Sequence, residues 1–450
     1  MMCDPVNPFG KLAEKYGDIF TLSFPKEIMV VLNTASLARE AKLERKDDLA
    51  GKSPKSFYPF GEILGEDLAT MDYSTAFLFR RRVFKSAMHV FGAGAEEAED
   101  RMRHAVETAL HEIDNMEGQP FSPKELLESS ILVQLWEWVT SKKLSLHDPT
   151  IEHLREFGDI VSKQALQSSL YQLIPFLTYL PTQFTRDIKR ALQLKNNLFP
   201  PVFRAHLETY TPGVIRDLTD SFICAYEKEM AKETGKDIGS IEDIPNIMVD
   251  VTFLGSDTTS TSLAWFILYV LLHDEVQKKI HKELDVVMDK DRLPRWKDAE
   301  KFPYLQATLC EVQRISGVAL IAGTNAIRDT TIAGYHIPKG TFVALNYTQL
   351  HHDGRDWPEP NKFRPERFLD SDGAFIGWSK HHAFLPFSLG RRECAGQSLA
   401  KIMMFNFAST LLHRYKIELP EGADRPSTDI SGPALVVRPQ DFKVVAKKRF

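Results

Sequence analysis

Apolar side chains recur at three- and four-residue spacing between residues 69 and 274, a pattern that indicates amphipathic helices. Five segments carry it most clearly: residues 77–90, 96–116, 123–140, 150–172 and 214–233. Gly and Pro lie between the segments, among them Pro200 and Pro201, and we expect helices to end before them. Residues 241–273 predict the longest helix. Its second half is apolar on nearly all sides, so we expect it to run through the centre of the molecule.

Strands are predicted near both ends of the chain. Residues 18–24 and 28–32 alternate or form a β-branched run, after a short helix over residues 8–16. Beyond residue 300, strands are predicted over 324–329, 331–337, 341–345, 434–438 and 443–447, and a last helix over 397–414. Because these strands must meet across the sequence, we expect one large domain over residues 1–450, mainly α with a small β region (α+β).

Composition and charge exclude several classes of protein. The chain is 43% hydrophobic and 26% charged, which is typical of a folded globular protein. A net charge of −5 argues against a nucleic-acid partner, since no basic excess is available to meet phosphates. The longest apolar run, residues 263–272, is too short to span a bilayer. Residues 1–10 show no leader, so we expect an N-terminal membrane anchor to be absent from this chain.

The four cysteines are far apart, which excludes a disulfide scaffold and a Cys-rich zinc module. Cys394 has the most unusual surroundings, because Arg391, Arg392 and the start of a predicted helix all favour its thiolate form. Flanking glycines let the backbone approach a flat object or another helix. A single thiolate on iron leaves room for a large planar cofactor, as in thiolate-ligated haem. The alternative for any one such residue is a buried structural cysteine.

The segment from Phe387 to Gly396 matches F-x-x-G-x-R-x-C-x-G, the cysteine-loop signature of cytochrome P450s, at every specified position. From about residue 16 to 442 the chain resembles this family, most of all the microsomal group with steroid 17α-hydroxylases and aryl-hydrocarbon-oxidising enzymes. The resemblance implies the P450 fold, in which a long central helix I covers a haem and the cysteine loop precedes helix L. It implies haem b, iron protoporphyrin IX, with Cys394 as metal ligand and with Phe387, Arg392 and Gly396 as cofactor-binding residues.

Further segments occur in the order that the family requires. Glu311 and Arg314 resemble the ExxR pair of helix K, and an i, i+3 spacing puts them on one helix face. Together with Arg367 of a PERF segment, they are implied to form a buried charge network behind the cysteine loop. Asp257 and Thr258 resemble the oxygen-activation segment, in which the acid and the hydroxyl deliver protons.

Other positions depart from the family pattern. Arg81 aligns with a haem-propionate ligand, although Phe77 replaces the usual Trp beside it. Asn325 stands where a His or Arg often contacts a propionate. Leu254 occupies the place of an Ala or Gly over the iron. With Val318 and Ala322 it is implied to line the substrate pocket, and all three are apolar.

The resemblance implies a haem-thiolate monooxygenase that inserts one oxygen atom of O2 into an apolar substrate: a steroid, a lipid or an aromatic xenobiotic. The chain has no dinucleotide fingerprint and no P-loop, so electrons must come from a partner. By resemblance this is NADPH-cytochrome P450 reductase, with cytochrome b5 as a further candidate. Basic residues could dock it on the proximal face: Arg80, Lys85, Lys380, Arg391 and Lys401.

The same resemblance implies the cytosolic face of the endoplasmic reticulum membrane, with peripheral contact through apolar segments such as residues 173–180. Two alternatives stay open at this point. The first is a P450-fold isomerase or dehydratase that acts on lipid hydroperoxides without O2 or reductase, and Leu254 is its only support. The second is a non-catalytic haem-binding member, motivated by the altered propionate contacts.

Overall fold

The computed structural model describes residues 9–24, 27–52, 67–91, 95–232, 239–319, 321–432 and 436–450. Contacts between residues divide the chain into two compact units, each built from separate parts of the sequence. The first unit consists of residues 1–51, 113–124 and 261–450, and the second of residues 52–112 and 125–260. The single domain expected from the sequence therefore stays a prediction.

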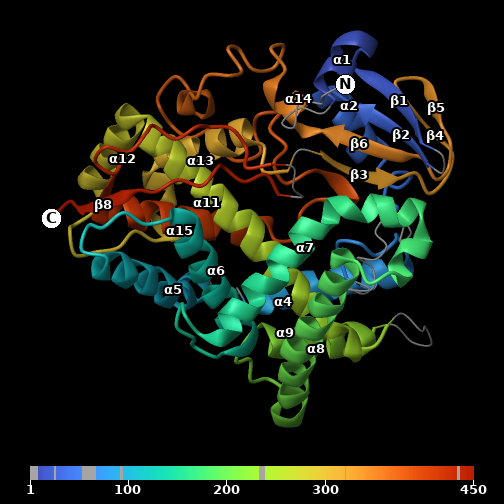
Figure 1. Ribbon diagram of the computed structural model, residues 1–450, viewed down its shortest axis with the longest axis horizontal. Coiled ribbons are helices and arrows are strands. Elements are labelled where there is room, and N and C mark those ends of the chain that lie inside the picture. The colour runs from blue at the N-terminus through green and yellow to red at the C-terminus, as the bar shows by residue number, and fades with distance from the viewer. Residues whose placement is uncertain are drawn as a thin grey trace. The chain divides into compact units, whose positions relative to one another are not determined.

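The main sheet of the first unit joins the two ends of the chain (Figure 1). Its strand order is β1 (Ile19–Phe24), β2 (Glu27–Leu32), β6 (Phe342–Asn346) and β3 (Ile321–Asn325). The β2–β6 pair is parallel and the other two pairs are antiparallel. The expectation that strands from both ends meet is confirmed. The helix α1 (Gly10–Tyr16) leads into this sheet.

Three strand predictions were wrong in detail. Of the predicted strand over 324–329, only residues 324 and 325 lie in a strand, at the end of β3. Residues 331–337 do not form one strand but belong to the hairpin of β4 (Thr330–Ile332) and β5 (Tyr335–Ile337), because Ala333 and Gly334 turn the chain with positive φ angles of 49° and 81°. Of the predicted strand over 434–438, the described residues 436–438 are not in a strand. The last strand, β8 (Val445–Lys448), pairs with β7 (Tyr415–Glu418), which the sequence pattern had not revealed.

The core of the first unit includes Trp357, Phe368 and Phe384, which are at most 3% exposed, and the helices α2 (Ala35–Arg39), α13 (Pro303–Ser316) and α14 (Tyr347–His352) contribute to it. The helices α12 (Asp274–Val287) and α15 (Gln397–Arg414) pack against α13. The bounds of α15 agree with the predicted 397–414. Helix α13 ends at Gly317, which takes the left-handed conformation with a φ of 56°.

The second unit is helical. Its helical segments are α4 (Thr75–Phe91), α5 (Ala95–Asn115), α6 (Pro123–Thr140), α7 (Pro149–Leu173), the 3-10 turn η3 (Pro175–Tyr179), α8 (Gln183–Thr209) and α9 (Leu218–Met230). The five predicted segments form helices, whereas α8 and η3 had not been predicted. Helix α9 starts at Leu218 rather than near residue 214, because the side chain of Asp217 caps it by accepting the N–H of Asp220.

The expectation that Pro200 and Pro201 end a helix was wrong, because both lie inside α8. Phe199 and Phe203 on either side of them are buried, with exposed fractions of 0% and 1%. Phe199 also packs edge-on against Trp136 of α6, with the ring centroids 5.8 Å apart. These tertiary contacts outweigh the local cost of two prolines.

The long helix predicted over residues 241–273 is confirmed as one run of helical turns. It comprises the 3-10 turn η4 (Ile241–Asp243), α10 (Ile244–Val249), the π-helical turn η5 (Asp250–Leu254) and α11 (Gly255–Leu272). Residues 263–270 are at most 6% exposed, in keeping with their apolar character on all sides. The π turn ends three residues before Asp257, and such turns are frequent at functional sites.

Candidate active site

The loop before α15 presents the thiol of Cys394. The backbone N–H of Cys394 donates to the carbonyl oxygen of Phe387 at 2.9 Å and so closes the loop. At Gly390 the backbone has a φ of +75°, and a Cβ atom there would lie 2.0 Å from the carbonyl oxygen of Lys42. Glycine is therefore required for the loop to pack this closely. Cys394 is exposed and lies three residues ahead of Gln397, where α15 begins.

The two arginines of the loop bind the segment 47–50. Arg391 forms an ion pair with Asp47, with its Nε and one terminal nitrogen 2.8 and 2.7 Å from Oδ1. The Nε of Arg392 donates to the carbonyl oxygen of Ala50 at 2.7 Å. Arg391 is therefore paired with a carboxylate of the protein itself, which argues against its expected role in docking a reductase.

The loop fits the haem that the sequence implied. A Cβ atom at Gly396 would meet no atom within 4 Å, so packing inside the protein does not explain the glycine there. An exposed thiol next to a stretch of backbone without a side chain suits a large planar group whose iron takes the sulfur as a ligand. Phe387, Arg392, Cys394 and Gly396 come from this one loop, which places the predicted haem contacts together.

Behind the loop, the structure brings together Glu311, Arg314 and Arg367. Glu311 and Arg314 have exposed fractions of 0% and form a bidentate pair, with both N–O distances 2.7 Å. Arg367 donates through Nε to Glu311 at 3.3 Å. Arg314 also donates to the carbonyl oxygen of His351 at 2.7 Å, and its guanidinium lies over the ring of Trp357. The network ties α13 to the segments on either side of the PERF turn.

The other predicted residues of the first unit have clear structural positions. The Nδ2 of Asn325 donates to the carbonyl oxygen of Gly340 at 3.2 Å, and its backbone forms a bridge with Gly51. Val318 is half-buried and its carbonyl oxygen accepts the N–H of Val437 at 2.9 Å. Ala322 is exposed on β3. The propionate role of Asn325 and the pocket roles of Val318 and Ala322 stay predictions.

In the second unit, Asp257 and Thr258 face different surroundings. Asp257 is buried and accepts a hydrogen bond from the Oγ of Ser162 on α7 at 2.9 Å. Thr258 is exposed, and its Oγ1 donates to the carbonyl oxygen of Leu254 at 2.8 Å. A hydroxyl bond of this kind, to the carbonyl one turn earlier, often bends a helix. Ser162 was not singled out from the sequence, since a lone Ser in a helix carries no signal.

The sequence also gave no hint of a buried acidic pair beside the π turn. Asp250 accepts the N–H of Leu68 at 2.8 Å. Within the described residues, its other oxygen and one oxygen of Asp67 have no hydrogen-bond partner. Burial raises the pKa of both carboxyl groups, and burial lowers the pKa of nearby Lys195, whose charge interacts with them. Asp67 lies before α4, Lys195 in α8 and Asp250 in the π turn. The interaction of their charges therefore links these three parts of the chain.

The three arginines in a row on α4, residues 80–82, differ in exposure. Arg80 is 2% exposed and forms an ion pair with Asp243 at 2.7 Å, so its assignment as a surface charge for docking was wrong. Arg82 is exposed, with Glu229 at 3.5 Å. Arg81 is partly buried, and its role as a propionate ligand stays a prediction.

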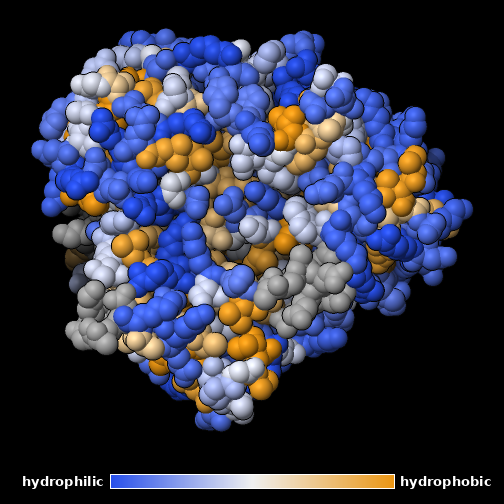
Figure 2. Space-filling view, turned by 180° about the vertical axis from the view of Figure 1, so that it is seen from behind, coloured by the Kyte–Doolittle hydropathy of each residue, from blue (hydrophilic) through white to orange (hydrophobic). Residues whose placement is uncertain are grey.

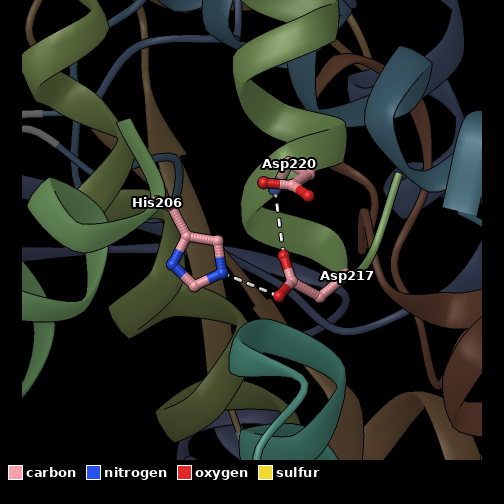
Figure 3. Close-up of side chains that lie close together, drawn as sticks. All are labelled: His206, Asp217 and Asp220. Atoms are coloured by element: carbon pink, nitrogen blue, oxygen red, sulfur yellow. Dashed lines mark hydrogen bonds and ion pairs between the residues drawn. The ribbon is translucent and has the colours of Figure 1, made fainter. Parts of the chain in front are cut away.

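A cluster of His206, Asp217 and Asp220 joins the end of α8 to the start of α9 (Figure 3). The Nε2 of His206 lies 2.7 Å from an Oδ2 of Asp217, and its Nδ1 lies 2.8 Å from the carbonyl oxygen of Val202. The same Asp217 oxygen accepts the hydroxyl of Ser141 at 2.9 Å. Both ring nitrogens of His206 are therefore engaged within the protein.

Asp220 is engaged in the same way. Arg216 donates to both of its oxygens, at 2.6 and 2.8 Å, while the Asp220 N–H donates to Asp217 at 3.0 Å. The atoms that could hold a metal ion thus have protein partners already. We interpret the cluster as a latch between two helices rather than as a metal site.

The latch makes stability depend on pH. Burial lowers the pKa of His206, but its hydrogen bond to Asp217 and the charges of Asp217 and Asp220 outweigh this and raise the pKa above the usual value. The stabilisation is therefore fully present below pH ~6.5 and is lost as the pH rises through the folded-state pKa. His206→Asn is expected to lower the free energy of unfolding by about 1–3 kcal/mol at pH 6, and by less at pH 9.

Thermal unfolding across this pH range measures the effect, with His153→Asn on α7 as the control because His153 is exposed. An equal loss of stability at pH 6 and pH 9 would show that the protonated pair is not what holds the latch.

Comparisons with known proteins agree with this geometry. A profile of the family described as Cytochrome P450 matches residues 4–446. The steroid 17-alpha-hydroxylase/17,20 lyase of Ictalurus punctatus is 31% identical over 448 residues, which cover 98% of this chain and 86% of that protein. Cytochrome P450 2D6 of Pan troglodytes is 29% identical over 450 residues, 98% of this chain and 88% of that protein. A solved zebra fish cytochrome P450 with progesterone has a TM-score of 0.86 at 28% identity, covering 99% of this chain and 100% of that one.

The likeness to solved structures confirms the predicted P450 fold. Members of the family bind haem, take electrons from a redox partner and act on apolar substrates with O2. The profile match over nearly the whole chain, with a cysteine loop built to present Cys394, shows that this chain belongs to the cytochrome P450 family of haem-containing monooxygenases.

Proposed function

We propose that the chain is a haem-thiolate monooxygenase that inserts one oxygen atom of O2 into a steroid, another lipid or an aromatic xenobiotic. The observation that carries the proposal is the exposed Cys394 in a loop that its own backbone bond to Phe387 closes. The names of relatives support the substrate class, since one is a steroid 17-alpha-hydroxylase/17,20 lyase and a similar solved structure contains progesterone.

The cysteine loop of the first unit would hold the haem. Cys394 would ligate the iron, and the backbone at Gly396 would lie along the ring without a side chain in the way. Arg392 is oriented by its bond to Ala50, which suits it to pair with a propionate. Arg81 and Asn325 are the further candidates for propionates.

Haem supplies, when bound, the oxidative chemistry that activates O2 and transfers an oxygen atom. The part of this chain is to deliver protons and to position the substrate. Thr258 is exposed and so is accessible for proton transfer, while Asp257 is held by Ser162 and can pass protons inward. Leu254, Val318 and Ala322 are proposed to contact the apolar substrate.

The ferrous carbon-monoxide difference spectrum tests the ligand directly. We expect a red-shifted, thiolate-type Soret band from the wild-type protein and its loss in Cys394→Ser. Cys310→Ser is the matched control, because Cys310 is a buried thiol and its replacement should leave the band in place. A band typical of histidine ligation that persists in Cys394→Ser would overturn the proposed function.

Turnover distinguishes the proposal from the alternative of hydroperoxide rearrangement. A monooxygenase consumes NADPH and O2 when a reductase is present, and its product contains one atom of the O2. Product formed from a lipid hydroperoxide without NADPH, and none formed with NADPH, O2 and reductase, would favour the isomerase or dehydratase instead.

The electron donor is proposed to be NADPH-cytochrome P450 reductase, with cytochrome b5 as a further donor, and the location the cytosolic face of the endoplasmic reticulum membrane. Within the described residues, no helix is both long enough and apolar enough to cross a bilayer. Figure 2 shows apolar residues as separate patches on one face of a mainly hydrophilic surface. Around the 3-10 turn η3, four apolar side chains are exposed: Ile174, Phe176, Tyr179 and Leu180.

We expect these side chains to bind a membrane surface. Phe176 and Tyr179 are 66% and 84% exposed, and burial of each ring in lipid would stabilise binding by about 1–2 kcal/mol. Phe176→Ser with Tyr179→Ser should therefore weaken binding to phospholipid vesicles roughly tenfold or more. Vesicle co-sedimentation measures this, with Val286→Ser on α12 as the control because Val286 is also exposed, at 80%. Equal weakening in the control would point to unspecific adsorption.

A further inference from the structure

Lys401, in the second turn of α15, lies between two aromatic rings. Its Nζ is 5.6 Å from the ring centroid of Trp378 and 5.2 Å from that of Phe387. The two rings are tilted by 50° with centroids 6.5 Å apart, so they form a wedge around the ammonium. Both distances are within the range of a cation–π interaction. We call Trp378, Phe387 and Lys401 the cation clamp.

The clamp is anchored on both sides. The indole Nε1 of Trp378 donates to Oε1 of Gln306 on α13 at 3.3 Å. Phe387 belongs to the cysteine loop, and its carbonyl oxygen accepts the N–H of Cys394. Lys401 is only partly exposed, although a lysine in the second turn of a helix could extend into water. The rings therefore hold a positive charge at a fixed place beside the cysteine loop.

The charge of Lys401 is close enough to act on two thiols. Burial lowers the pKa of Lys401, while interactions with Cys310 and Cys394 raise it. Burial raises the pKa of Cys310, and the charge of Lys401 opposes that rise. The ammonium thus lies within electrostatic reach of the sulfur that the proposed function assigns to the iron.

We infer that Lys401 is a positioning residue that acts through Cys394, and that its clamped charge sets the reduction potential of the iron site. The inference rests on the proposed function, in which Cys394 ligates the iron. Reduction adds one electron to a site that already carries the negative thiolate. A fixed cation nearby favours the reduced form, so loss of the cation should shift the midpoint potential to more negative values.

The sequence analysis named a different role for Lys401, as one candidate among the surface charges that could dock a reductase. The two roles predict different results. A docking charge changes electron transfer from the reductase and depends on salt, but it leaves the midpoint potential unchanged. A clamped charge changes the midpoint potential in the absence of any reductase.

The experiment is a potentiometric titration of the haem-loaded protein with dithionite and small-molecule mediators, which donate the electron. Lys401→Met removes the charge but keeps an unbranched side chain that packs between rings. Lys401→Arg keeps the charge and the contact with the rings. The control is Lys380→Met, because Lys380 is exposed two residues beyond Trp378 and its loss changes the net charge equally.

We expect a negative shift of the midpoint potential in Lys401→Met, a potential close to wild type in Lys401→Arg, and no shift in Lys380→Met. Trp378→Leu should shift the potential in the same direction as Lys401→Met but less, because Phe387 still contacts the ammonium. The carbon-monoxide difference spectrum is recorded for each variant.

The outcomes separate the inference from the function on which it rests. A thiolate-type band in all variants with the same potential for Lys401→Met and Lys380→Met would overturn the inference and leave the proposed function standing. A wild-type protein without a thiolate-type band would overturn both.

Discussion

Glu311→Gln should destabilise the protein by about 3–5 kcal/mol and prevent much of it from folding around haem. The change removes the carboxylate from a fully buried network in which Arg314 and Arg367 both donate to it. Breaking a buried ion pair leaves an uncompensated charge, which costs far more than the pair itself contributes. The backbone N–H of Arg364 also donates to Glu311, so the PERF segment loses an anchor. Against a typical total stability of about 5–15 kcal/mol, this loss is severe.

Chemical denaturation and the haem content of the purified protein measure this effect. The matched control is Glu366→Gln, because Glu366 lies in the same PERF segment. Glu366 pairs with Lys279 at 2.7 Å, but the side chains are 44% and 55% exposed, so its loss should cost no more than about 1 kcal/mol. Similar losses in both variants would mean that burial does not set the strength of the network.

Gly390→Ala should disrupt the cysteine loop by about 2–5 kcal/mol. Two costs add at this position. The φ of +75° is unfavourable for any residue with a Cβ atom, and that atom would lie 2.0 Å from the carbonyl oxygen of Lys42. The carbonyl belongs to the backbone of the π-helical turn η1 (Glu40–Glu44) and cannot move aside as a flexible side chain could.

Substitutions at two other glycines serve as controls. They separate the cost of steric overlap and of a positive φ from an effect on haem binding. Gly354→Ala places a Cβ atom in open space without a positive φ and should leave stability nearly unchanged. Gly396→Ala also meets no protein atom, so it should fold normally, yet it should bind haem less well if the ring lies against this backbone. Unfolding curves and haem content measure both. A stable, haem-replete Gly390→Ala protein would contradict the packing argument.

The sequence pattern predicted helices best where residues at the helix ends mark the boundaries. The bounds of α6 and α15 agree with the predicted segments, since a Pro or Gly at the start marks each of them locally. The pattern failed at Pro200 and Pro201, where buried contacts of Phe199 and Phe203 maintain α8. It also joined β4 and β5 into one strand, because the turn between them includes Ala333, a residue that rarely takes a positive φ.

By itself, the sequence determined the family and its chemistry, because one short loop carries the signature. The backbone shape of that loop and its metal ligand require particular residues at fixed spacing: Phe387, Gly390, Arg392, Cys394 and Gly396. The tertiary structure decided where the charges act. The buried Arg80 pairs with Asp243, and Lys401 lies between the rings of Trp378 and Phe387. Their partners are distant in sequence, and the burial that makes such charges strong exists only once those segments pack together.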